Sequence, residues 1–318
     1  MKIKPMTKFA ILALSLVLVA CAGGGSEEAG CPAIDGREIN VVATTPMIGE
    51  FVSQVGGENI NLTVLMPPEA NPHTYEPAPQ DAGTIAEADL VFYTGLLYEP
   101  AALVKLLENS ACSTDILSEV GESVFPIEFK EGGHDDHEGH NHGAYDPHFW
   151  FDPSRVAYAA EYIESRLIQF DPENESSYKS SADSFVSELN DLTKQVSELI
   201  STVPSQNRKL ITTHESLGYL EAKFGLEVLS TIIPSLNSAN EISPSDLAGV
   251  IDVIEDNNVK VIFIESEAPS VYSETIVAET GIKPVTGLYV ETLKPGQSYS
   301  EFLISNVTLI TENLQDTD

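Results

Sequence analysis

The sequence predicts an α/β protein of two lobes, each with a parallel four-stranded sheet flanked by helices, joined by a single long helix. Three observations support this fold class. From Glu38 onward, short apolar β-type runs alternate with helical runs, which is typical of parallel sheets. The alternation occurs twice with the same plan. Between the two series lies a stretch whose apolar residues are spaced by three or four, as on one face of a helix.

The expected elements of the two lobes follow in chain order. The first lobe has expected strands at Ile39–Thr44, Asn61–Met66, Asp89–Thr94 and a candidate fourth near Ser123–Ile127, with helices around Ile48–Val55, Pro79–Glu87 and Pro100–Leu107. The second series starts after Pro204, with strands Lys209–Thr213, Glu227–Ile232, Val259–Glu265 and Lys283–Tyr289, and helices near Ser216–Phe224, Pro244–Asp256, Ser270–Thr280 and Tyr299–Asn313.

Two helices are expected between the lobes, at Pro153–Phe170 and Glu173–Val203. The second carries an apolar face made of Phe185, Leu189, Leu192, Val196, Leu199 and Val203. The predicted organisation is therefore a signal peptide at 1–20, a flexible tether at 21–37, an N-terminal lobe at 38–152, connecting helices at 153–203 and a C-terminal lobe at 204–318.

The chain begins with an export signal. Three lysines precede an apolar run from Phe9 to Ala20 that only Ser15 interrupts, and the run is too short to span a bilayer comfortably. Leu18, Val19 and Ala20 before Cys21 match a lipobox, so we expect cleavage before Cys21 and lipid attachment to its thiol. The alternative is a plain secretory signal with Cys21 incidental. In both cases we expect an exported protein, and with a lipid on Cys21 we expect it to be anchored to the cell membrane, on the extracytoplasmic face or in the periplasm.

Cys31 and Cys112 are the remaining cysteines. In an oxidising compartment a disulfide persists, so we expect the two to pair and to fix the start of the chain to the first lobe. Two buried free thiols are the alternative.

The charge of the chain excludes one class of partner. Removing a leader with three lysines and no acid changes the formal net charge from −33 to −36. Nucleic acid is excluded, because its binding depends on Lys and Arg that neutralise phosphates.

Histidines fall into two groups. His134, His137, His140 and His142 lie in the Gly-flanked, apolar-free segment 131–142, which we expect to be an exposed loop. His73 and His214 each follow a predicted strand, where open α/β sheets bind their ligands. His148 lies in DPHFWFDP, where Asp146 or Asp152 is placed to accept the second N–H of a metal-bound imidazole.

Four segments in order, NPHTYEP, DPHFWFDP, TTHESLGYLEAKFGL and GLYVETL, resemble the motifs of the cluster A-I (cluster 9) substrate-binding proteins of zinc and manganese ABC importers. The resemblance runs from about Ile39 to the C-terminus. It implies a metal bound between the lobes by His73, His148, His214 and usually one carboxylate. We expect Glu291 to be that carboxylate, with an open water position or another acid as alternatives. Glu265 is expected to orient a ligand histidine.

Three imidazoles and a carboxylate suit Zn²⁺, although the same set also accommodates Mn²⁺ or Fe²⁺. The histidine-rich segment favours zinc, because the similar zinc-specific proteins often carry one. We predict a monomer that captures Zn²⁺ and delivers it to the permease and ATPase subunits of an importer. A zinc hydrolase is the rival, but the chain lacks HExxH and a nucleophile elbow. An adhesin is a weaker one, since the chain has no repeats.

Overall fold

The computed structural model describes residues 31, 33–34, 36–129, 145–237, 240–267 and 271–315. All of them belong to the unit Cys31–Asp318. The predicted signal peptide, the lipid site Cys21 and the histidine-rich segment 131–142 lie outside the described residues. Among the described helices, none has both the length and the apolar character needed to cross a bilayer.

The first lobe contains a four-stranded parallel sheet in the order β2-β1-β3-β4. Its elements are β1 (Ile39–Ala43), α1 (Pro46–Gly56), β2 (Ile60–Val64), α2 (Pro79–Ala86), β3 (Leu90–Tyr93), α3 (Ala101–Ser110) and β4 (Leu117–Glu119). Because all four strands are parallel, their carboxyl ends meet at one edge of the sheet. The loops that follow β2 and β3 leave from that edge.

Helix α1 shows how local sequence sets these elements. Thr45 caps it by accepting a hydrogen bond from Ile48 N, and Pro46 occupies the first turn, where its missing N–H costs nothing. Its buried face, with Phe51 and Val55, packs against the connecting helices. The helix ends at Gly56, and Gly57 adopts a φ of +55° that favours glycine.

The fourth strand of the first lobe is not at Ser123–Ile127, where the sequence predicts it, but at Leu117–Glu119. The apolar residues of the predicted segment lie in and just after a short 3-10 turn instead of a strand. Val124 ends a short 3-10 turn and is buried, whereas Phe125 adopts a left-handed φ of +52° with its side chain 66% exposed. β4 has a polar central residue, Ser118, which is buried and accepts a hydrogen bond from Arg166 Nε. A strand this short and polar gives no apolar run to detect.

The second lobe contains two parallel strand pairs, β5 with β6 and β7 with β8. Its elements are β5 (Lys209–His214), α6 (Gly218–Phe224), β6 (Glu227–Ile233), α7 (Pro244–Asn257), β7 (Val261–Glu265), α8 (Val271–Thr280), β8 (Lys283–Leu288) and α9 (Tyr299–Gln315). β5 and β7 lie side by side, but no backbone ladder joins them in the described residues. Instead, Glu265 N donates to Thr213 Oγ1 and Glu265 Oε1 accepts from His214 N. Side chains thus replace the ladder between the two pairs.

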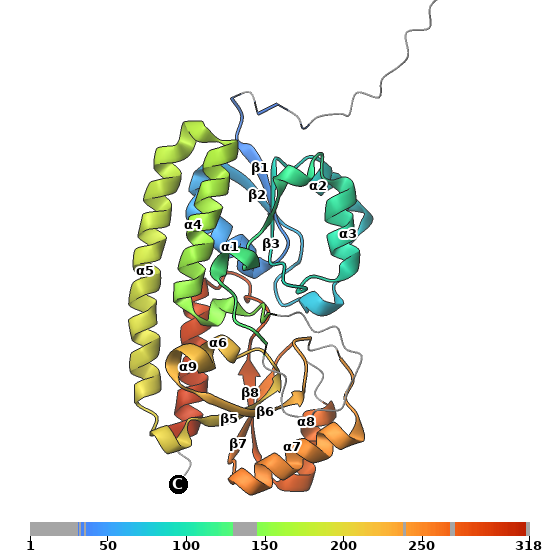
Figure 1. Cartoon of the computed structure of the whole chain (residues 1–318), viewed down its shortest axis with the longest axis vertical. Helices are drawn as coiled ribbons and strands as arrows, with labels where there is room; N and C mark the ends of the chain where they lie inside the picture. Colours follow the sequence, from blue (N-terminus) through green and yellow to red (C-terminus); the bar gives the residue numbers. More distant parts are fainter. Residues whose placement is uncertain are drawn as a thin grey trace, which may run out of the picture. The chain divides into compact units, whose positions relative to one another are not determined.

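Two long helices connect the lobes, α4 (Pro153–Phe170) and α5 (Glu175–Ser201). The predicted apolar face of α5 is buried from Phe185 to Val196. At 27 residues α5 is about 40 Å long, and it packs against α1 and α4 near one end and α9 near the other. Figure 1 shows α5 running beside both lobes. A continuous helix in contact with both lobes limits how far they can rotate against each other.

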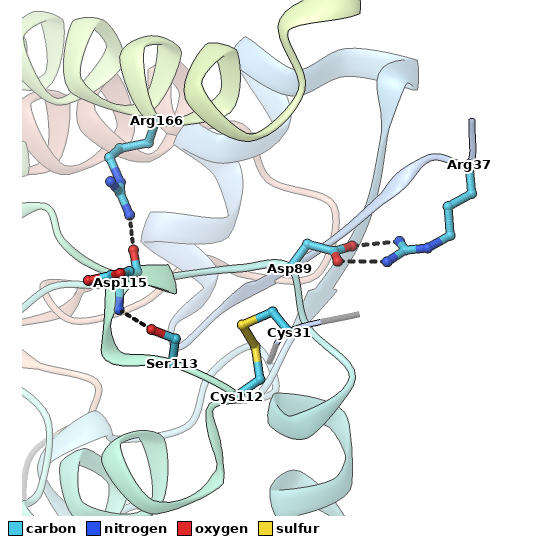
Figure 2. The surroundings of a disulfide bond; sticks show 7 residues. All are labelled: Cys31, Arg37, Asp89, Cys112, Ser113, Asp115 and Arg166. Carbon is cyan, nitrogen blue, oxygen red and sulfur yellow. Dashed lines mark hydrogen bonds and ion pairs between the residues drawn. A yellow bond between two sulfur atoms is a disulfide. The ribbon is translucent and has the colours of Figure 1, made fainter. Parts of the chain in front are cut away.

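The start of the described chain is fixed to the first lobe, as Figure 2 shows. Cys31 and Cys112 form a disulfide across 81 residues. Both terminal nitrogens of Arg37 donate to the carboxylate of Asp89 at 2.6 Å, and Asp89 also accepts from Asn40 N. Two residues within the predicted tether 21–37, Cys31 and Arg37, are thus bonded to the first lobe.

Replacing both Cys31 and Cys112 with alanine should lower the free energy of unfolding by about 2–4 kcal/mol, since the disulfide closes a long loop and restricts the unfolded chain. Equilibrium urea denaturation of the exported protein measures this. A reducing agent should destabilise the parent protein to the same extent and leave the double variant unchanged. Equal stability of parent and variant would show that the disulfide contributes nothing.

Candidate metal site

His73 follows β2 in a proline-rich loop and lies in the 3-10 turn Pro72–Thr74. Asn71 caps this turn by accepting a hydrogen bond from His73 N at 2.9 Å. The Asn71 amide also donates to Glu267 O in the second lobe at 3.1 Å. The loop is thus held from both lobes, and the His73 side chain is only 3% exposed.

His148 lies just before the buried turn Phe149–Phe151. Asp146 Oδ1 accepts from both the backbone N (2.9 Å) and Nδ1 (2.8 Å) of His148. α6 supports this pair from the second lobe. Tyr219 donates to Asp146 O at 2.8 Å, and a Cβ at Gly218 would approach Asp146 Oδ2 to 2.6 Å, so a side chain there would displace the carboxylate.

His214 is the last residue of β5, and its Nδ1 donates to the carboxylate of Glu265 at the end of β7. Two of the three candidate orienting acids, Asp146 and Glu265, therefore bind a histidine Nδ1. Asp152 does not. It accepts from the backbone N and hydroxyl of Ser154 and caps α4, because its side chain follows the turn that carries His148 and faces the helix start.

Glu291 lies three residues after β8 and is fully buried. Its backbone N and that of Val290 donate to Glu267 Oε1, while Val290 O accepts from Trp150 Nε1 at 2.8 Å. Contacts from the second lobe and from the turn after His148 thus fix the segment that carries Glu291.

The four side chains converge. Nε2 of His73 and Nε2 of His214 each lie 2.9 Å from Glu291 Oε1, and Nε2 of His148 lies 3.5 Å from Glu291 Oε2. One ligand atom from each residue lies within 4.8 Å of all the others. Four ligands around a zinc ion at about 2.0–2.1 Å are about 3.3 Å apart, so these separations fit a bound ion.

The hydrogen bonding of the imidazoles also fits a metal. With Nδ1 of His148 and of His214 bound to a carboxylate, each Nε2 turns toward the centre of the site. Both Nε2 atoms are buried and lie near Glu291, but in the described part of the chain neither makes a hydrogen bond of acceptable geometry. A buried polar atom without a partner is costly, and coordination to a metal would satisfy both atoms.

Tyr98 completes the surroundings of Glu291, and the sequence reasoning missed it. Its hydroxyl donates to Glu291 Oε2 at 2.9 Å and lies 3.0 Å from Glu291 O. Burial and the charge of Glu291 raise the pKa of Tyr98 well above its usual value, so the phenol keeps its proton. The segment GLLYEP follows β3 directly, and the rule that ligand sites lie beyond strand ends would have found it.

Electrostatics favour protons on the imidazoles when no metal is bound. Burial lowers the pKa of His148, but the hydrogen bond to Asp146 and the nearby carboxylate of Glu291 outweigh burial and raise it to about 9. For His214, burial is likewise outweighed by the charges of Glu265 and Glu291, and the pKa lies well above its usual value. Interactions with the imidazoles of His73 and His214 overcome burial and hold the pKa of Glu291 well below its usual range.

Comparison with known proteins identifies the family. The family ZnuA, described as "Zinc-uptake complex component A periplasmic", matches residues 41–313. The chain belongs to this family. Members of the ZnuA family are solute-binding proteins and not enzymes, and with the site of three His and one Glu the chain is a metal-binding substrate protein of an ABC importer.

Relatives within the ZnuA family carry names for different metals. The manganese ABC transporter substrate-binding lipoprotein PsaA of Streptococcus anginosus is 28% identical over 98% of this chain and 99% of its own length. The high-affinity zinc uptake system protein ZnuA of Bacillus subtilis is also 28% identical, over 96% of each chain. The periplasmic zinc binding protein TroA of Treponema pallidum shares the fold, with a TM-score of 0.77 at 22% identity over 87% of this chain and 99% of its own.

The metal-free protein should lose stability as the pH rises. A group whose pKa is raised on folding stabilises the fold fully below its unfolded pKa, near 6.5 for histidine, and stops doing so as the pH passes the folded value, about 9 for His148. We therefore expect the melting temperature of metal-free protein to fall between pH 6.5 and 9.5. Thermal unfolding with a chelator tests this. Asp146→Asn should weaken the dependence, and an equal dependence in both proteins would contradict the assignment.

Proposed function

We propose that this protein captures Zn²⁺ outside the cytoplasm and delivers it to an ABC importer, with His73, His148, His214 and Glu291 as the ligands. The observation that supports this best is the convergence of three imidazole Nε2 atoms and one carboxylate in a buried space between the lobes. Mn²⁺, or Fe²⁺, is the alternative cargo.

The donor set favours zinc. Zn²⁺ is commonly bound at four tetrahedral positions by imidazole and carboxylate, whereas Mn²⁺ prefers oxygen ligands and more of them. Three imidazole nitrogens and one carboxylate match the ligand set that Zn²⁺ commonly takes. Glu291 fills the position that a catalytic zinc would leave to water, which argues against a hydrolase.

Release of the metal should involve small lobe shifts and loop opening. The long helix α5 packs against elements of both lobes, and the loop of His73 is itself bound to the second lobe through Asn71. Breaking contacts of the His73 loop would open the site without a wide hinge motion.

Replacing His73, His148 or His214 with alanine should weaken zinc binding at least about 100-fold, because even residues that only orient a ligand contribute 10–100-fold. Competition against a chelator of known affinity, on metal-stripped protein, measures this for each variant. Zinc against manganese competition on the parent protein then identifies the preferred cargo.

Asp152→Asn is the matched control, since Asp152 lies in the same segment as His148 but caps α4. It should bind zinc as the parent does. Parent-like affinity in all three histidine variants would refute the site.

For the histidine-rich segment 131–142 we propose that His134, His137, His140 and His142 bind zinc weakly and raise its local concentration. Deleting the segment should reduce uptake when zinc is limiting, while the affinity of the purified protein at the lobe site stays the same. Unchanged uptake at every zinc concentration would favour a tolerated insertion without a transport role.

We further propose that Cys21 carries the lipid that anchors the protein to the membrane. Relatives of the chain are named as lipoproteins, which supports this. Anchoring keeps the metal-loaded protein close to the permease and ATPase subunits that it serves.

A further inference from the structure

The two carboxylate oxygens of Glu291 have different surroundings. Oε1 lies 2.9 Å from Nε2 of both His73 and His214, inside the group of candidate ligand atoms. Oε2 lies 3.5 Å from Nε2 of His148 and accepts a hydrogen bond from the hydroxyl of Tyr98 at 2.9 Å. Oε1 thus lies closest to two of the candidate ligand nitrogens, and Oε2 is the oxygen that the phenol holds.

The loop that presents Tyr98 is held in an unusual conformation. Three successive residues have positive φ values: Gly95 (+75°), Leu96 (+52°) and Leu97 (+63°). Residues other than glycine rarely adopt this left-handed region, so the two leucines are strained. Such strain persists only where the surroundings fix the backbone.

Buried hydrogen bonds supply that fixation. The carboxylate of Glu99 accepts from Thr94 N (2.7 Å), Gly95 N (2.9 Å) and the hydroxyl of Thr44 (2.7 Å). Leu96 N donates to Glu119 Oε1 at 2.8 Å, and Tyr98 N donates to Gly95 O at 2.9 Å. These bonds fix the backbone of Tyr98 without involving any of the candidate metal ligands.

The ring of Tyr98 is fixed as well. It is 2% exposed and makes edge contacts with the rings of His73 (5.1 Å between centroids), His148 (5.9 Å) and Trp150 (5.3 Å). The phenol cannot swing away from Glu291 without displacing two candidate ligands.

We propose that Tyr98 is a specificity-determining residue: by holding Glu291 Oε2 it makes Glu291 a one-oxygen ligand and favours four-coordinate Zn²⁺ over Mn²⁺. This inference rests on the proposed function. A four-coordinate ion needs one oxygen from Glu291, whereas Mn²⁺ reaches a higher coordination number by taking both oxygens of a carboxylate. Taking Oε2 would remove its charge-assisted hydrogen bond and leave the buried phenol with only the backbone carbonyl of Glu291.

Tyr98→Phe tests the proposal, because it removes the hydroxyl and keeps the ring. Tyr178→Phe is the matched control: Tyr178 is also buried and donates to a carboxylate, Asp171, but at the junction of α4 and α5. Zinc and manganese dissociation constants of parent and variants are measured by competition on metal-stripped protein. X-ray absorption spectroscopy of the zinc-loaded and manganese-loaded proteins gives the coordination number.

We expect the ratio of zinc affinity to manganese affinity to fall about tenfold in Tyr98→Phe and to stay unchanged in Tyr178→Phe. Manganese-loaded Tyr98→Phe should gain a carboxylate oxygen relative to the parent. An unchanged ratio in Tyr98→Phe, an equal fall in the control, or a two-oxygen Glu291 in the zinc-loaded parent would each overturn the inference and leave the proposed function standing. A parent protein that does not bind zinc would instead refute the proposed function.

Discussion

The carboxylate of Glu291 is the interaction on which the rest of the site depends. It is buried at the end of the second lobe, and it contacts His73 and Tyr98 of the first lobe, His148 of the segment before α4, and His214 of β5. Each partner is fixed independently by its own loop or strand. The carboxylate thus contacts side chains from both lobes, and these contacts depend on how the two lobes are placed relative to each other.

Most of the helices and strands can be predicted from the sequence, because each has a periodic pattern of apolar residues along the chain. Apolar runs and helical spacing locate β1, β7 and the buried face of α5 within a few residues. They fail at β4, where a three-residue strand with a buried serine at its centre carries no apolar run. They also fail between β5 and β7, since side-chain hydrogen bonds of Glu265 and Thr213 replace a backbone ladder there. The order of residues along the chain shows apolar periodicity, but it does not show which side chains form hydrogen bonds between distant strands.

The candidate site divides in the same way. Motif order and strand ends bring attention to the three histidines and Glu291, and the principle that bound imidazoles need a second partner points to Asp146 and Glu265. It points equally to Asp152, because a carboxylate four residues after His148 looks as suitable as one two residues before it. Only the turn geometry separates them. Tyr98 was not predicted, because an aromatic residue between leucine and glutamate is typical of a hydrophobic core. Its position also depends on the left-handed backbone of Leu96 and Leu97, and leucine does not predict that conformation.

The charges around the site explain how it can exist both with and without its ion. Asp146, Glu265 and Glu291 place three carboxylates in a buried space, and repulsion among them would push the lobes apart. The raised pKa values of His148 and His214 favour a proton on each imidazole when no metal is bound. Binding of a divalent cation requires neutral imidazoles and therefore displaces protons, so the positive charge that leaves the imidazoles partly offsets the charge of the ion. The lobes need not separate to relieve repulsion when the ion leaves, which agrees with a connection made of a continuous helix in place of a flexible hinge.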